Sequence, residues 1–163
     1  SRPVEGDAFT VQFLNRTDRP RSIHPHGVQY DENNEGADMN SSGLVVPAGA
    51  SFTYIWPANS NSGSAPNDSS SIVWLCHLHV DAMRKVYDDL IGTIVLTKRG
   101  MESSTDDPSP KGVDRALTTL FMVFNENAEG QEEEGHIVHA MNGFIFGNLE
   151  GWEVEKVIWV RWH

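Results

Sequence analysis

Short segments in which apolar and polar residues alternate run along most of the chain, separated by clusters of Asn, Asp, Gly and Pro. A period of two is typical of β-strands with one buried face, and it is clear in residues 8–14 (AFTVQFL) and 51–56 (SFTYIW). Residues 72–80 and 90–97 are more continuously apolar and are also predicted to be strands. No long segment has the 3.6-residue period of a helix. The pattern therefore predicts an all-β sandwich or barrel.

The character of the sequence changes near residue 100. Residues 98–112 are charged and rich in Ser and Pro, which is typical of a linker, and a new strand is predicted over 116–124. We therefore expect a first β-domain over 1–100, a linker over 101–112 and the start of a second β-domain over 113–163. Both domains are expected to be incomplete, because about fifty residues are too few to enclose a sandwich core.

Four connecting segments carry weaker predictions. Residues 23–30 are interpreted as a short strand, and residues 59–71, rich in Ser, Asn and Gly, as a mobile connection. Residues 81–89 are interpreted as a helical turn, and the glutamate run Glu132 to Glu134 as part of a solvated loop.

The acidic composition narrows the possible functions. The 163 residues carry 12 Lys and Arg against 23 Asp and Glu, and the net charge of −11 argues against binding to nucleic acids or anionic membranes. No apolar run is long enough to span a membrane.

Three Asn-x-Ser/Thr sequons, at Asn15, Asn40 and Asn67, favour a secreted glycoprotein. Since the chain starts at Ser1 without an initiator Met, we expect a fragment or processed segment of a longer protein.

Two short histidine pairs are the strongest chemical signal. They are His24-Pro25-His26-Gly27 and His77-Leu78-His79. On an extended strand the two residues of a His-x-His pair point to the same face, so the two pairs offer four converging imidazoles. Imidazole is a ligand for copper, zinc, iron and nickel, and the pairs therefore predict a transition-metal site.

Zinc and incidental pairing are the alternatives to a copper site. A structural zinc site normally includes cysteines at short spacings such as Cys-x-x-Cys, which this chain lacks, whereas spacing alone leaves a catalytic zinc open.

Asp81 is either a hydrogen-bond partner of a ligand histidine or the cap of the next turn. Cys76 is the only cysteine, so it cannot form an internal disulfide, and we expect a buried, inert thiol.

A set of motifs in a fixed order resembles a known family. His24 to Val28, then Asn34 to Ala37, then Trp74 to Asp81, then Leu90 to Gly92 are similar to the first cupredoxin domain of multicopper oxidases, most of all to the ceruloplasmin and hephaestin branch. Met141 to Leu149 is similar to the segment that opens the second cupredoxin domain of that branch. The resemblance implies cupredoxin-like Greek-key β-sandwiches, present here as partial domains.

The resemblance also implies roles for the four histidines. His24 corresponds to a ligand of the type 2 copper, and His26, His77 and His79 correspond to ligands of the type 3 coppers. Together they are half of a trinuclear copper cluster, whose other half comes from a C-terminal cupredoxin domain of the same chain with a His-Cys-His motif. Cys76 precedes His77 and does not match that motif. No catalytic residue is implied beyond the metal ligands.

The implied function is that of a ferroxidase, which transfers electrons from Fe(II) to O₂ and produces Fe(III) and water. This chain alone is expected to be inactive, and the whole protein to be secreted or to form the extracellular part of a membrane-anchored protein in iron homeostasis. Two alternatives remain: a non-enzymatic, secreted copper-binding or structural cupredoxin domain, and a small oxidase that assembles its cluster between identical subunits.

Two departures from the family pattern are visible. Ser71 and Thr97 occupy the places of a disulfide that the family often has, so both cysteines are missing together. An acidic pair associated with calcium in this domain is not evident, and calcium binding is not predicted. The clotting-factor relatives have lost most of the cluster histidines, whereas this chain keeps all four, which favours an oxidase lineage.

Overall fold

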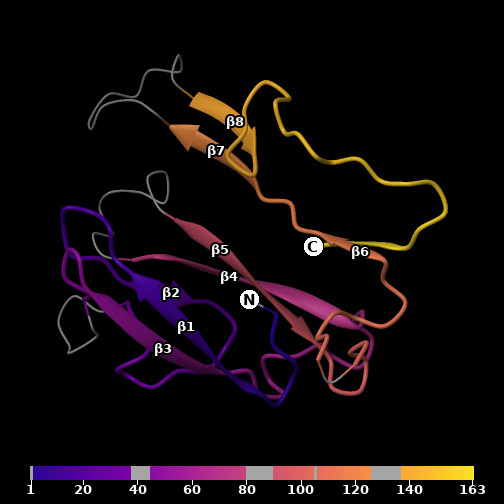
Figure 1. The fold of residues 1–163 in the computed structure, drawn as a ribbon, viewed down its shortest axis with the longest axis horizontal. Helices are drawn as coiled ribbons and strands as arrows, with labels where there is room; N and C mark the ends of the chain where they lie inside the picture. The colour runs from indigo at the N-terminus through magenta and orange to yellow at the C-terminus, as the bar shows by residue number, and fades with distance from the viewer. Residues whose placement is uncertain (1, 38–44, 80–89, 105, 126–136) are drawn as a thin grey trace. The chain divides into compact units, whose positions relative to one another are not determined.

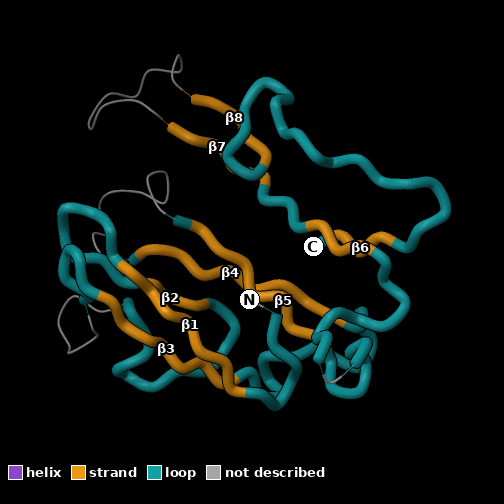
Figure 2. Tube along the Cα trace, viewed as in Figure 1, coloured by secondary structure: helices purple, strands orange, loops and turns teal. Residues whose placement is uncertain are grey.

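The computed structural model describes residues 2–37, 45–79, 90–104, 106–125 and 137–163, and these residues form nine strands and no helix. No helix in these ranges could therefore cross a membrane. The strands are β1 Ala8–Leu14, β2 Ile23–Pro25, β3 Ser51–Pro57, β4 Ser71–Leu78, β5 Ile91–Thr97, β6 Arg115–Leu117, β7 Phe121–Asn125, β8 Ile137–Met141 and β9 Val160–Trp162 (Figure 1; Figure 2). The prediction of an all-β chain is confirmed.

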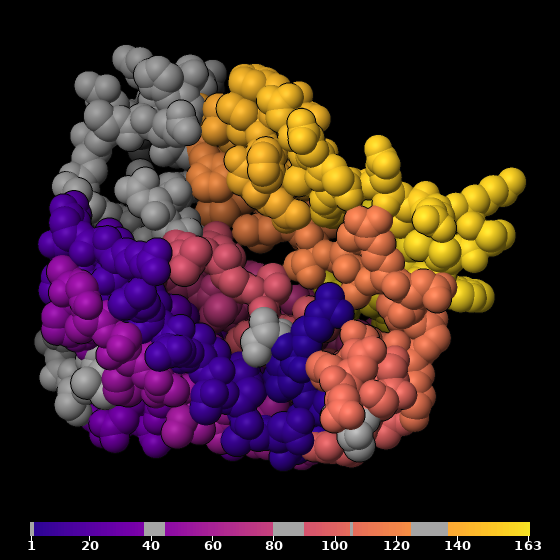
Figure 3. Space-filling model, viewed as in Figure 1, coloured from indigo at the N-terminus to yellow at the C-terminus, as the bar shows by residue number. Residues whose placement is uncertain are grey.

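The chain divides into two compact units, residues 1–112 and 113–163. The domain and linker boundaries drawn from the sequence stay a prediction. Residues 101–112 fold back within the first unit, where Lys111 N donates to Met101 O at 2.7 Å. Figure 3 shows the indigo N-terminal segment beside this salmon-coloured stretch, and Arg2 donates to Ser109 Oγ at 3.3 Å.

The first unit contains two antiparallel sheets, β1–β3 and β2–β4–β5. Alternation places every second residue of β1 and β3 on the inner side, as in the pair Val11 and Tyr54. Tyr54 and Trp56 are fully buried, whereas Ile55 between them is half exposed. Residues of both sheets share one core, made of Phe13, Ile23, Val28, Val46, Tyr54, Trp56, Leu78 and Ile94. The two sheets therefore pack face to face as a sandwich.

The order of strands in the larger sheet is what assembles the histidine pairs. β4 lies between β2 and β5, so β2 pairs with a strand about fifty residues further along the chain. In this register His24 lies opposite His77, and Pro25 lies opposite Cys76. A shift by one residue would move the histidines to opposite faces, so the buried partners Ile23 and Leu78 fix the register.

Two predicted elements differ from the structure. The strand expected over 23–30 ends at Pro25, because Gly27 adopts a positive φ of 70° and turns the chain into the core at Val28. The connection over 59–71, expected to be mobile, contains a hydrogen-bonded turn in which Asn59 Oδ1 accepts from Ser62 N at 3.2 Å. The helical turn expected over 81–89 and the acidic loop with Glu132 to Glu134 lie outside the described residues.

The second unit holds two small sheets. β7 and β8 are antiparallel, and β6 and β9 are parallel. The strand predicted over 116–124 is split into β6 and β7. Asn142 holds the segment between these two strands, because its Oδ1 accepts from Leu120 N at 2.7 Å. Apolar residues near the end of the chain would be expected to pack in a core, but Trp159 and Trp162 are 76% and 54% exposed. Each sheet here has only two strands within the described residues, which is too little to cover such large side chains.

The first unit offers a site for a stabilising disulfide. Ser71 and Thr97 lie opposite each other on β4 and β5, and both are buried. Because Lys98 N donates to Ser70 O, the adjacent pair of Ser71 and Thr97 is a non-hydrogen-bonded pair, with Cα atoms about 4.5 Å apart. That separation lies within the range that disulfides use. Neither hydroxyl has a hydrogen-bond partner among the described residues, so removing them costs little.

The double variant Ser71→Cys/Thr97→Cys is therefore expected to form a disulfide and to raise the free energy of unfolding by about 3.5 kcal/mol, from the loop closed in the unfolded chain. Denaturant unfolding of the oxidised variant measures the gain, and the same sample after reduction is its control. Equal midpoints for the oxidised and reduced samples would contradict the expectation.

Candidate metal centre

The structure brings all four predicted histidines into one cluster at the end of β2 and β4. The ring centroid of His24 lies 5.1 Å from that of His26, 6.0 Å from that of His77 and 5.3 Å from that of His79. The centroids of His77 and His79 are 5.6 Å apart. The four rings therefore converge as the sequence pattern predicted, while their role as metal ligands stays a prediction.

The closest approach in the cluster is between His26 and His77. Their Nε2 atoms are 2.9 Å apart, and the ring planes are inclined by only 25°. Two imidazole nitrogens bound to one tetrahedral ion at about 2.0–2.1 Å lie roughly 3.3 Å apart. The pair therefore needs to open by only a few tenths of an ångström to hold a single ion between the two nitrogens.

Two backbone carbonyls fix the tautomers of the rings. His24 Nδ1 lies 2.8 Å from Glu35 O, and His77 Nδ1 lies 2.7 Å from Leu78 O. Because a carbonyl can only accept, both Nδ1 atoms carry the proton, and each Nε2 keeps its lone pair. An imidazole oriented in this way is ready to bind a metal through Nε2.

The role of Glu35 was not visible in the sequence, because a backbone carbonyl has no side-chain signature. Gly36 allows the loop that carries the Glu35 carbonyl to approach β2, because a Cβ at residue 36 would lie 2.0 Å from Ile23 O. The loop can therefore lie directly against β2 only with glycine at residue 36. The Asn-Glu-Gly sequence was a usable signal for this close approach.

Burial and neighbouring rings favour the neutral form of His24 and His26. Burial lowers the pKa of His24, and the neighbouring His79 and His77 lower it further, although the Glu35 carbonyl opposes them. Burial also lowers the pKa of His26, assisted by His24 and His77. Neutral imidazole is the form that binds metals, so these shifts favour the ligand state of His24 and His26.

Trp74 holds the backbone beside His26. A Cβ on Gly27 would lie 1.9 Å from Trp74 Cδ2, so the indole occupies the space that any other residue at 27 would fill. The indole nitrogen donates to Ser62 O at 2.8 Å, which anchors the ring to the turn after Asn59. Gly27 and Trp74 together therefore set the direction in which His26 leaves β2.

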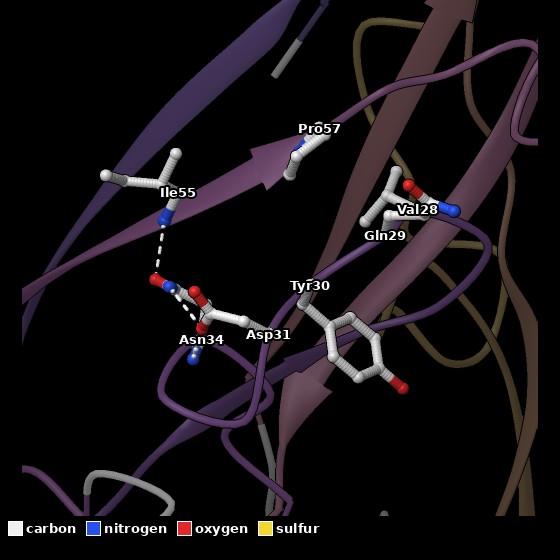
Figure 4. A pocket seen from close by; sticks show the side chains of 7 residues that line it. All are labelled: Val28, Gln29, Tyr30, Asp31, Asn34, Ile55 and Pro57. Atoms are coloured by element: carbon white, nitrogen blue, oxygen red, sulfur yellow. Dashed lines mark hydrogen bonds between the residues drawn. The ribbon is translucent and has the colours of Figure 1, made fainter.

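A pocket of about 620 Å³ opens between the loop 28–34 and β3. Its Tyr30 ring packs edge-on against His24, with centroids 5.4 Å apart. Figure 4 shows Asn34 reaching Ile55, whose N donates to Asn34 Oδ1 at 2.8 Å, while the Tyr30 ring extends away from the strand. Asp31 Oδ1 accepts from Asn34 N and Nδ2, so its carboxylate orders the loop that leads to Glu35.

Asp81, predicted to be either a hydrogen-bond partner of a ligand histidine or a turn cap, lies outside the described residues. His136 also lies outside them, and His139 is an exposed residue of β8 in the second unit. Cys76 is a free, half-buried cysteine, and burial raises the pKa of its thiol, in keeping with an inert side chain.

Within the described residues, no three His, Cys, Asp or Glu side chains surround a single point as one ion requires. The four imidazoles instead form an open set, which suits several ions better than one. Copper and this donor set agree, because imidazole is a preferred copper ligand. The remaining ligands of each ion would have to come from outside the described residues.

Comparisons with known proteins agree with this geometry. A family model described as multicopper oxidase matches residues 2–100. Mouse hephaestin is 32% identical over 97% of this chain, mouse ferroxidase HEPHL1 is 30% identical over 99%, and human coagulation factor V is 27% identical over 97%. The chain spans only 16% of the length of hephaestin and of HEPHL1, and 7% of that of factor V.

Solved structures share the fold. A blue copper oxidase from Nitrosomonas europaea matches 99% of this chain and 48% of its own length, with a TM-score of 0.66 and 20% identity. Lac15 from a marine microbial metagenome matches 86% of this chain and 33% of its own, with a TM-score of 0.58 and 19% identity. The predicted cupredoxin-like fold is thereby confirmed. Since the family model covers more than half of the residues, the chain belongs to the multicopper oxidase family, whose cofactor is copper.

Proposed function

We propose that this chain supplies half of the trinuclear copper site of a larger ferroxidase. His24 would bind the type 2 copper, and His26, His77 and His79 would bind the type 3 coppers. The observation that carries the proposal is the 2.9 Å approach of His26 Nε2 to His77 Nε2, which suits one shared ion. The open arrangement of the four imidazoles supports completion by a second domain, the C-terminal cupredoxin domain of the same protein.

The reaction proposed for the whole protein oxidises four Fe(II) to four Fe(III) while one O₂ takes up four protons and becomes two waters. Bound copper supplies the one-electron transfers of this chemistry. Burial favours the neutral form of His24 and His26. The carbonyls of Glu35 and Leu78 fix the tautomers of His24 and His77, and Trp74 holds the backbone beside His26. The name of the relative ferroxidase HEPHL1 supports Fe(II) as the reductant.

The domain organisation is part of the proposal. Residues 1–100 would be the C-terminal part of a first cupredoxin domain, 101–112 a linker and 113–163 the start of a second. The whole protein would be a secreted glycoprotein, or the extracellular part of a membrane-anchored one, that acts in iron homeostasis. The sequons and the similarity to hephaestin support this placement.

The second candidate is a non-enzymatic, secreted copper-binding or structural domain. Similarity to coagulation factor V over 97% of the chain supports it, because that protein's name is not that of an oxidase. The four retained histidines favour the oxidase.

Elemental analysis of the full-length protein from its natural source separates the two candidates. We expect three or more coppers per chain, because a trinuclear cluster completed by a partner domain holds three ions. Copper well below one per chain would instead favour the structural domain.

A further inference from the structure

Asn15 and Asn67, the sequon asparagines among the described residues, are used by the fold in opposite ways. Asn15 is 1% exposed, and its Nδ2 donates to Arg19 O at 2.8 Å and to Val46 O at 3.0 Å. A side-chain amide has two N–H groups, so both donors of Asn15 are engaged, one in a part-buried and one in a buried hydrogen bond. A sugar on this nitrogen would remove one donor and require space that the core does not have.

The threonine of this sequon also has a structural role. Thr17 N lies 3.0 Å and Thr17 Oγ1 lies 2.8 Å from Asn15 Oδ1. This is the arrangement in which an Asn side chain closes a turn over the next residues. The Asn-x-Thr pattern at residues 15–17 therefore forms a turn at the end of β1.

Asn67 lies in the opposite setting. It is exposed at the third position of a turn in which Asp68 N donates to Ala65 O at 3.0 Å. Pro66 occupies the second position, where its fixed φ favours a turn, and Ala65 N donates to Asp68 Oδ2 at 2.8 Å. The backbone and Asp68 thus hold the turn, which presents Asn67 to solvent.

The position of this turn along β4 leaves room for a bulky group. The turn precedes Ser71, the first residue of β4, whereas His77 lies near the end of the strand. Six residues of extended strand span about 20 Å. The partner domain of the proposed function would dock at the histidine cluster. A glycan on Asn67 would therefore lie at the opposite end of β4 from that docking surface.

We propose that Asn67 is the acceptor of an N-linked oligosaccharide and that Asn15 is not. The donor would be a lipid-diphosphate-linked oligosaccharide of the secretory pathway. A bond forms between sugar C1 and Asn67 Nδ2, the bond between C1 and the diphosphate oxygen breaks, the lipid diphosphate leaves, and the amide loses one proton. The inference rests on the secreted location in the proposed function, and it adds that the turn 65–68 faces solvent in the whole protein.

The test uses the full-length protein secreted from animal cells, with Asn40→Gln so that Asn15 and Asn67 are the sequons left in this part of the chain. Peptide-N-glycosidase in H₂¹⁸O converts each glycosylated Asn into an ¹⁸O-labelled Asp, which peptide mass spectrometry locates. We expect the label at residue 67 and unlabelled Asn at residue 15. Ser69→Ala should abolish the label at 67, whereas Thr17→Ser, which keeps both the sequon and the hydroxyl, should leave the pattern unchanged.

An unlabelled residue 67 in the secreted protein would overturn the inference, and so would a label at residue 15. Copper per chain is measured on the same preparation. A glycan at Asn67 without copper would sink the ferroxidase proposal and leave this inference standing, and copper without a glycan would do the reverse.

Discussion

Replacing His77 with alanine in the full-length protein is expected to remove copper and to lower the rate of Fe(II) oxidation by more than about a hundredfold. Loss of a hydrogen-bond partner of a ligand already costs 10–100-fold in many metal sites, and loss of the ligand itself costs more. His77 is the side chain closest to His26 and also contacts His24 and His79. Elemental analysis and stopped-flow oxidation of Fe(II) measure the two effects.

The same pair allows a sharper test of a shared ion. If His26 and His77 hold one copper, the double variant should lose no more activity than either single variant, because the first replacement already removes the ion. His139→Ala is the matched control, since His139 is an exposed histidine of the second unit. Additive losses at His26 and His77, or an equal loss at His139, would contradict the assignment.

Gly27→Ala is expected to destabilise the protein by about 4 kcal/mol or more, a range reached only by severe disruptions. The new Cβ would lie 1.9 Å from the Trp74 ring, and the backbone would keep a φ of 70° that L-residues disfavour. Since Trp74 is anchored through Ser62, the ring cannot move away without breaking that hydrogen bond. Copper content should fall as well, because Gly27 follows His26 directly.

Gly49→Ala separates the steric clash with Trp74 from the cost of a positive φ at a residue with a side chain. Gly49 has a φ of 75°, close to that of Gly27, but a Cβ there would meet nothing within 4 Å. Its cost should be about 1–2 kcal/mol, from the backbone alone. Urea unfolding of both variants gives the difference that belongs to the Trp74 contact. Equal costs for the two variants would mean that this contact does not hold the turn.

The strands could be predicted because a strand with one buried face alternates apolar and polar residues along the sequence. Val11 and Tyr54 face one core, and Ile55 faces outward, as the alternation requires. The strand over 23–30 was predicted too long because Val28, an apolar residue after Pro25, is buried by a turn and not by a strand. Pattern alone cannot distinguish these two routes into a core.

The four histidines were identified from the sequence because a period of two aligns side chains, and because the family motif gave each pair a partner. The tautomers were not predictable, since they depend on the carbonyls of Glu35 and Leu78. Nor was the structural use of Asn15 predictable, because the sequon pattern is the same in a buried turn and on the surface. Both depend on contacts between segments that are distant in the sequence.

The hydrogen bond from Ile55 N to Asn34 has a consequence for folding in a long chain. It lies on the outer edge of β3, where Gln29 N also donates to Pro57 O. An open sheet edge recruits strands from other molecules, and covering it is a common protection against aggregation. Here a loop from the same unit covers the edge. The outer edge of β3 is therefore not available for pairing with a strand of a neighbouring chain while the rest of a long protein is being synthesised.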